Sequence, residues 1–148
     1  MAHGRVDRIL RESDGAVDVG LVGLGDLGED LAALAGGSSL EVEVIDDTQL
    51  ESMGAGAIHG VGKGSARGPR IAVLRYRPAG AQKHVAMVGK GITFDTGGIS
   101  LKPGASMFTM KMDMGGAAAV AGAVFAAAEL GVQANITGIL CLAENMPS

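Results

Sequence analysis

The sequence predicts a soluble α/β domain, and three observations support this prediction. Of the 148 residues, 47% are hydrophobic, and a mean hydropathy of +0.31 argues against a disordered chain. The chain contains 25 glycines but only 3% aromatic residues, which indicates tight turns and close backbone packing rather than bulky side chains. Apolar runs of strand length alternate with helix-like segments. A chain of this length can form one domain with a real core or part of a larger protein.

The first predicted elements are a strand and a short helix. The run LEVEVI, residues 40–45, has the apolar character and the length of one strand. The next segment, DDTQLESMG, predicts a short capped helix that ends at Gly54. The stretch that follows, up to residue 69, is too rich in glycine to form regular structure throughout.

The second half of the chain predicts three more strands and a long helix. RIAVLRY (70–76) and KHVAMVGK (83–90) alternate as strands, and the Pro/Gly turn between them predicts a hairpin. Residues 114–130 have the spacing of a helix that ends at Gly131, and we expect it to be buried because it is apolar on every face. ANITGILCLAEN (134–145) predicts a buried strand.

Charge and cysteine content exclude several classes of protein. The net charge is −4 and no Lys/Arg stripe interleaves with aromatic residues, so we expect no nucleic-acid partner. The longest apolar tract, residues 114–128, is shorter than the roughly 18 residues of a membrane span, and we expect a cytoplasmic protein. Cys141 is the single cysteine, which excludes an internal disulfide and a zinc site built from several thiolates.

Residues 1–39 form a separate, glycine-rich segment that predicts a strand, a turn and a helix. Gly23, Gly25 and Gly28 follow a strand-like run and precede a helix-like one, with Asp46 at the end of the next strand. This pattern is typical of a dinucleotide-binding module, in which the glycines approach a pyrophosphate and the aspartate takes the ribose hydroxyls. The pattern is weak alone, and a glycine-containing strand-turn-helix connection is the simpler interpretation.

Lys90, Asp95, Lys102 and Asp113 stand out among the charged residues of the glycine-rich stretch 88–116. Lys90 ends the predicted strand 83–90, and strand ends are where α/β proteins place their sites. Asp95 follows five residues later, and Asp113 supplies a second carboxylate if the loop folds back. Carboxylates suit a divalent cation, and Lys90 could join them as a neutral amine. Lys102 would stay protonated and stabilise charge that develops on a carbonyl oxygen. Ordinary ion pairs between these lysines and aspartates are the alternative.

Three motifs resemble the leucyl aminopeptidases, the cytosol aminopeptidases that use two metal ions. The most specific is KGITFDTGGISLKPG, residues 90–104, which is followed by MKMDMGGAAAV (110–120) and AENMPS (143–148). The resemblance covers about residues 40–148, which we treat as a partial catalytic domain. Residues 1–39 resemble neither the N-terminal domain of the family nor the segment that enters its catalytic domain, and only EDLAALAGG (29–37) could stand in for the entry helix.

The resemblance implies a role for five residues. Lys90 matches an unusual lysine ligand of the metal site, Asp95 the aspartate that bridges both metals, and Asp113 a further ligand. Lys102 matches the catalytic lysine that polarises the scissile carbonyl. Met110 matches a wall of the pocket for the N-terminal side chain of the substrate.

The family also implies a fold and a reaction. Its catalytic domain is an αβα sandwich around a mixed, mainly parallel sheet, and its members assemble as homo-hexamers. They remove the N-terminal residue of a peptide, using two divalent ions, manganese or zinc, with magnesium or cobalt as further possibilities.

The chain departs from the family after its last motif. The family continues into an Asp-x-Glu-x-Arg motif that supplies two metal ligands and an arginine for a bound bicarbonate. Here the only acidic residues after Asp113 are Glu129 and Glu144, and no arginine follows Arg77, which speaks against a bicarbonate. Two carboxylates and one amine cannot fully coordinate two dications. We therefore expect a truncated domain that is inactive alone, or a non-catalytic assembly subunit.

Overall fold

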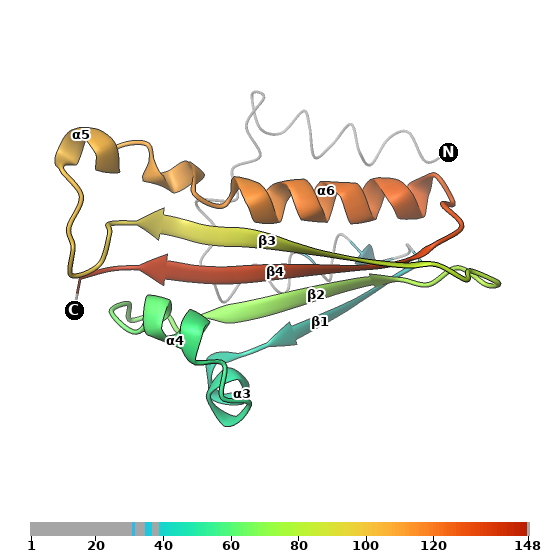
Figure 1. Cartoon of the computed structure of the whole chain (residues 1–148), viewed down its shortest axis with the longest axis horizontal. Coiled ribbons are helices and arrows are strands. Elements are labelled where there is room, and N and C mark those ends of the chain that lie inside the picture. The colour runs from blue at the N-terminus through green and yellow to red at the C-terminus, as the bar shows by residue number, and fades with distance from the viewer. Residues whose placement is uncertain (1–30, 32–34, 37–38, 148) are drawn as a thin grey trace.

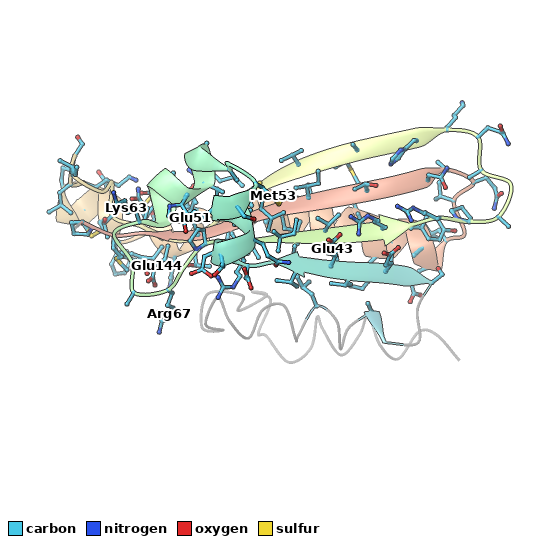
Figure 2. The ribbon with its side chains drawn as sticks, turned by 90° about the horizontal axis from the view of Figure 1, so that it is seen from below. Glu43, Glu51, Met53, Lys63, Arg67 and Glu144 are labelled. Atoms are coloured by element: carbon cyan, nitrogen blue, oxygen red, sulfur yellow. The ribbon has the colours of Figure 1, made fainter. Side chains whose placement is uncertain are left out.

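The computed structural model describes residues 31, 35–36 and 39–147. In this part of the chain four strands form one sheet, with α6 along one face and α3 and α4 on the far side of the sheet from α6 (Figures 1 and 2). This arrangement agrees with the expected α/β sandwich. The elements in chain order are β1 (Leu40–Ile45), α3 (Asp47–Ser52), α4 (Gly56–Gly62), β2 (Arg70–Tyr76), β3 (His84–Asp95), α5 (Gly104–Met107), the 3-10 helix η1 (Met110–Met112), α6 (Gly115–Glu129) and β4 (Asn135–Asn145).

The sheet is mixed, as expected, with the strand order β1-β2-β4-β3. Strand β2 pairs antiparallel with both β1 and β4, whereas β3 and β4 run parallel. Antiparallel pairings therefore predominate among the described strands, in contrast to the mainly parallel sheet that the resemblance implied. The parallel pair arises because the chain crosses over one face of the sheet through α6 between β3 and β4 (Figure 1).

The hairpin predicted between residues 70–76 and 83–90 is wrong. Both strands form, but β4 lies between them and pairs with each. Strand β4 is apolar over most of its length, and a central position pairs both of its edges and buries it. The local Pro/Gly turn signal carries no information about a distant strand that inserts between its two neighbours.

The short helix α3 forms as predicted, because both of its ends carry the expected signals. The Gln49 amide donates to Asp46 Oδ1 at 2.8 Å and the Asp46 amide donates to Gln49 Oε1 at 2.9 Å, which completes a capping box. Gly54 follows the helix with a φ of 71°. Asp46 thus has a structural role. The glycines of the dinucleotide pattern, Gly23, Gly25 and Gly28, lie outside the described residues.

Helix α6 packs on the sheet through one face only, so the prediction of burial on every face is wrong. Val124 is fully buried against a core that includes Leu74, Leu140 and Leu142. The outward positions of α6 are mostly alanine and glycine, which expose little apolar area although the hydropathy of the helix is high. None of the described helices is both long enough and apolar enough to cross a membrane.

Two glycines let the start of α6 lie directly against β3. A Cβ atom on Gly89 would come within 2.5 Å of the Gly116 carbonyl oxygen and 2.6 Å of Ala117 Cα. A Cβ atom on Gly116 would come within 3.0 Å of the Lys90 amide nitrogen. The obstructing atoms belong to the backbone and cannot rotate away, so only glycine permits this approach.

We predict that Gly89→Ala lowers the free energy of unfolding by about 1–3 kcal/mol, because the new methyl group must push α6 away from β3. Gly122→Ala in the same helix is the control. Its new methyl group meets nothing within 4 Å and should leave stability unchanged or raise it by up to about 1 kcal/mol. Urea unfolding followed by circular dichroism measures both; equal stability of the two variants would contradict the close approach.

Candidate active site

The candidate site lies where the parallel strands β3 and β4 end side by side. Asp95 is the last residue of β3, and it stands opposite Asn145, the last residue of β4. The register shifts between Ile92 and Phe94, so the end of β3 is locally irregular. The carboxyl ends of neighbouring parallel strands are the usual place for a site in an α/β sheet.

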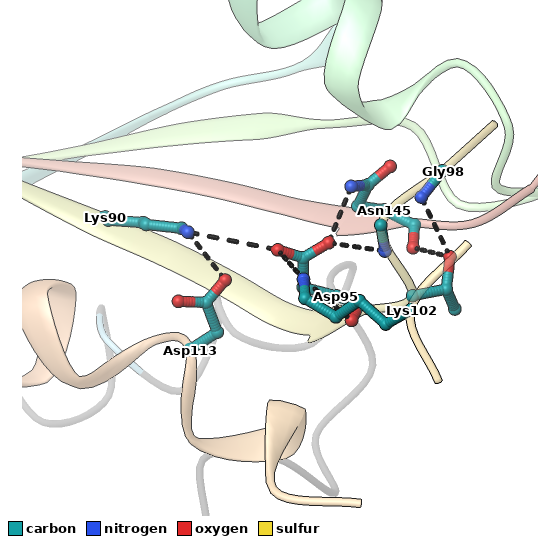
Figure 3. A network of polar contacts seen from close by, with 8 residues as sticks. Lys90, Asp95, Gly98, Lys102, Asp113 and Asn145 are labelled. Carbon is teal, nitrogen blue, oxygen red and sulfur yellow. Dashed lines mark hydrogen bonds and ion pairs between the residues drawn. The ribbon is translucent and has the colours of Figure 1, made fainter. Parts of the chain in front are cut away.

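Asp95 is the centre of a polar network (Figure 3). Its Oδ1 accepts a hydrogen bond from the Gly97 amide at 2.9 Å and another from Asn145 Nδ2 at 2.6 Å. Its Oδ2 lies 2.7 Å from Lys102 Nζ and 4.0 Å from Lys90 Nζ. The two oxygens therefore have different partners: neutral donors hold one, and the two lysines face the other.

Asp113 joins this network through Lys90, which also faces Asp95. Its Oδ2 is 2.6 Å from Lys90 Nζ, and its backbone oxygen accepts the Ile92 amide at 3.2 Å, which ties the end of η1 to β3. Asp113 Oδ2 is buried and receives no hydrogen bond of good geometry, so the adjacent ammonium group is its electrostatic partner. The close packing of Gly89 and Gly116 brings this segment within reach of β3.

Lys102 reaches Asp95 because the intervening loop turns back on itself. Gly97 and Gly98 have φ values of 91° and 67°, which favour glycine, and the Lys102 amide donates to the Thr96 carbonyl oxygen at 2.8 Å. The Lys102 side chain is 28% exposed, so it faces both the carboxylate and the open side of the site.

The structure thus brings together four of the five residues to which the resemblance gave a role. Lys102 contacts Asp95, and Lys90 lies between Asp95 and Asp113. The fifth, Met110, begins η1 three residues before Asp113 and is half-buried. Sequence reasoning did not single out Asn145. A pairing of the ends of the two predicted strands would have placed it beside Asp95, but the order of the strands was not available from local patterns.

Comparison with known proteins assigns the chain to a family. The sequence model for the catalytic domain of the cytosol aminopeptidase family matches residues 26–148. The chain belongs to the cytosol aminopeptidase family. The match includes residues 26–39, ahead of the motifs on which the resemblance was based.

Individual relatives and solved structures align over most of the chain. A probable cytosol aminopeptidase from Streptomyces avermitilis is 56% identical over 124 residues, 81% of this chain and 24% of that protein. The leucyl aminopeptidase of Trypanosoma cruzi has a TM-score of 0.81 at 40% identity, covering 86% of this chain and 25% of that one. The bottromycin maturation enzyme BotP, in complex with Mn, has a TM-score of 0.78 at 40% identity, covering 88% and 30%. This chain spans about a quarter of the length of the curated relatives it matches.

The electrostatics of this cytosol aminopeptidase segment keep Asp95 ionised. Burial by itself would raise the pKa of Asp95, but hydrogen bonds from Lys102, Gly97 and Asn145 outweigh it and hold the pKa well below its usual range. Burial also raises the pKa of the Cys141 thiol. At neutral pH Asp95 therefore offers a charged carboxylate oxygen, a donor type that suits a divalent cation.

The residues present fit part of a metal centre. Among residues 31, 35–36 and 39–147, no group of three or more His, Cys, Asp and Glu side chains is placed to hold a metal ion. Asp95 and Asp113 nevertheless present two carboxylates to one amine, Lys90, and the buried Asp113 Oδ2 lacks a well-aligned hydrogen bond. Such a donor set suits one hard or borderline divalent ion, with its remaining positions filled from elsewhere.

We predict that the stability advantage of the parent chain over Asp95→Asn shrinks in acid. A carboxyl group whose folded pKa is depressed stabilises the fold above its unfolded pKa, near 3.8, and loses this contribution as the pH falls toward the folded value. The difference in free energy of unfolding should therefore narrow below about pH 4. Urea unfolding at a series of pH values tests this; a constant difference down to about pH 2 would show that the Asp95 contacts do not favour the charged form.

Proposed function

We propose that this chain forms part of a metal-dependent aminopeptidase that releases N-terminal residues, of the leucine type, from peptides. The observation that carries the proposal is the convergence of Lys90, Asp95, Lys102 and Asp113 at the ends of parallel strands. Family membership supports the same activity. The proposal includes the family's cytoplasmic location and its homo-hexameric assembly.

In this proposal, Lys90, Asp95 and Asp113 hold divalent ions of manganese or zinc, with magnesium or cobalt as alternatives. BotP, which has the same fold over this segment, is described in complex with Mn. When bound, such ions supply Lewis acidity and an activated water. The three side chains do not complete two coordination shells, so the remaining donors must come from outside this set.

Lys102 acts on the substrate in this proposal. Its ammonium group is anchored by Asp95 Oδ2 at 2.7 Å and by the Asp95 carbonyl oxygen at 3.4 Å, which fixes a positive charge at the edge of the site. A fixed positive charge there stabilises the negative charge that develops on the oxygen of the scissile carbonyl. Met110 contributes an apolar wall for the N-terminal side chain of the peptide.

We predict that the chain binds Mn²⁺ at one weak site and that Asp113→Asn raises the dissociation constant at least about tenfold, because it removes a charged oxygen donor. Glu41→Gln is the control, since it removes the same charge from an exposed carboxylate on β1 that pairs with Arg75 and Arg77. Isothermal titration calorimetry measures all three proteins. Heat with NADH but not with Mn²⁺ would favour the dinucleotide-binding alternative.

We predict that Lys102→Ala, in a full-length enzyme that contains this segment, lowers kcat for leucine p-nitroanilide by about 10²-fold or more with little change in KM. The loss falls on kcat because the ammonium group meets the full negative charge only in the transition state. Lys83→Ala, which removes an exposed lysine before β3, should retain the parent kcat. Undiminished turnover by Lys102→Ala would overturn the role of Lys102. Absence of turnover in the full-length parent would favour a non-catalytic assembly subunit.

A further inference from the structure

Asn145 is hydrogen-bonded to the end of β3 and to the residue after it, through both its side chain and its backbone. Its Nδ2 donates to Asp95 Oδ1 at 2.6 Å (Figure 3). Its backbone oxygen accepts the Thr96 amide at 3.0 Å and the Thr96 hydroxyl at 2.8 Å. Thr96 is 5% exposed, so these two bonds lie inside the protein and hold the turn after Asp95 in place. Only the side-chain bond reaches the candidate metal ligand.

The contacts of Asp95 divide sharply between its two oxygens. Oδ1 accepts two hydrogen bonds, one from the Asn145 side-chain amide and one from the Gly97 backbone amide. Oδ2 is left to Lys102 and Lys90, on the side where Asp113 also lies. A carboxylate held by one oxygen cannot rotate about its Cβ–Cγ bond without breaking both neutral hydrogen bonds, so Oδ2 stays aimed at the site.

We propose that Asn145 is a positioning residue, whose carboxamide holds Asp95 Oδ1 and thereby directs Oδ2 toward the metal position. This inference rests on the proposed function, in which Asp95 binds a metal ion. It adds a residue that acts through a ligand rather than as one. Outer-shell partners of this kind commonly change metal affinity by about 10–100-fold when they are removed.

The chemistry of the side chain suits this task. A carboxamide donates to Asp95 without adding charge, whereas a carboxylate at residue 145 would repel Asp95 across the same short distance. The other end of the carboxamide faces Gly98, where a Cβ atom would come within 3.0 Å of Asn145 Oδ1. The loop therefore leaves room for a side chain of this size.

The strand end that carries Asn145 is itself tethered by the loop after α4. The preceding residue, Glu144, accepts a hydrogen bond from Ser65 Oγ at 2.6 Å and pairs with Arg67 Nη1 at 3.2 Å. This tether holds the end of β4 but does not touch Asp95. Ser65→Ala therefore provides a matched control, since it loosens the same strand end without removing the bond to the candidate ligand.

The decisive experiment compares Asn145→Ala with Ser65→Ala in the 148-residue chain without metal. The alanine variant keeps the backbone oxygen and hence the bonds to Thr96, so it removes the side-chain contact alone. If Asn145 fixes the carboxylate, Asp95 should rotate in this variant and release the Gly97 amide. We predict that hydrogen exchange of the Gly97 amide, measured by NMR, accelerates at least about tenfold in Asn145→Ala and stays near the parent rate in Ser65→Ala.

Calorimetric titration with Mn²⁺ supplies the functional measurement. The dissociation constant should rise about tenfold or more in Asn145→Ala and less than about twofold in Ser65→Ala. Asn145→Leu, which keeps about the same size and adds no charge but cannot donate a hydrogen bond, should behave like the alanine variant and serves if the latter does not fold.

The outcomes separate this inference from the proposed function. Unchanged exchange at Gly97 in Asn145→Ala would overturn the positioning role whatever happens to Mn²⁺ binding, as would equal acceleration in Ser65→Ala, because that would indicate general fraying of β4. A parent chain that binds no Mn²⁺ would contradict the proposed metal site of this chain, and the exchange at Gly97 would still decide whether Asn145 orients Asp95.

Discussion

The hydrogen-bonded carboxylate of Asp95 is the interaction on which the rest of the site depends. Its donors come from both parallel strands and from the loop between β3 and α5, so a single side chain joins Lys90, Gly97, Lys102 and Asn145. A partly buried carboxylate without such donors would be costly to ionise, and here the donors come from all of these segments. The hydrogen bonds to Asp95 therefore determine both the conformation of the loop and the charge of the site.

Small residues make this convergence possible. Gly89 and Gly116 allow the backbones of β3 and α6 to touch, and that contact carries Asp113 to Lys90. Gly97 takes a backbone conformation that disfavours side chains, and the turn it makes returns Lys102 to Asp95. In this region, therefore, glycines lie at the positions where the main chain brings charged groups close to one another.

Much of this could be predicted from local sequence patterns, and the failures share one physical origin. The strand at residues 40–45 and the capped helix after it depend on short segments whose signals are local. The gathering of Lys90, Asp95, Lys102 and Asp113 was expected from their motifs, although Asp113 reaches Lys90 through the packing of α6 on β3. The supposed hairpin failed because strand order is set by burial of the distant β4. Asn145 was missed for the same reason, since only that strand order places it beside Asp95.

The two lysines balance the negative charge of the site. Lys90 and Lys102, when protonated, offset Asp95 and Asp113 one for one, so the folded chain needs no cation to neutralise these two carboxylates. In the proposed function a metal ion would therefore bind a chain that has already folded, and it would take the place of the positive charge of Lys90 alone, because Lys102 keeps its charge.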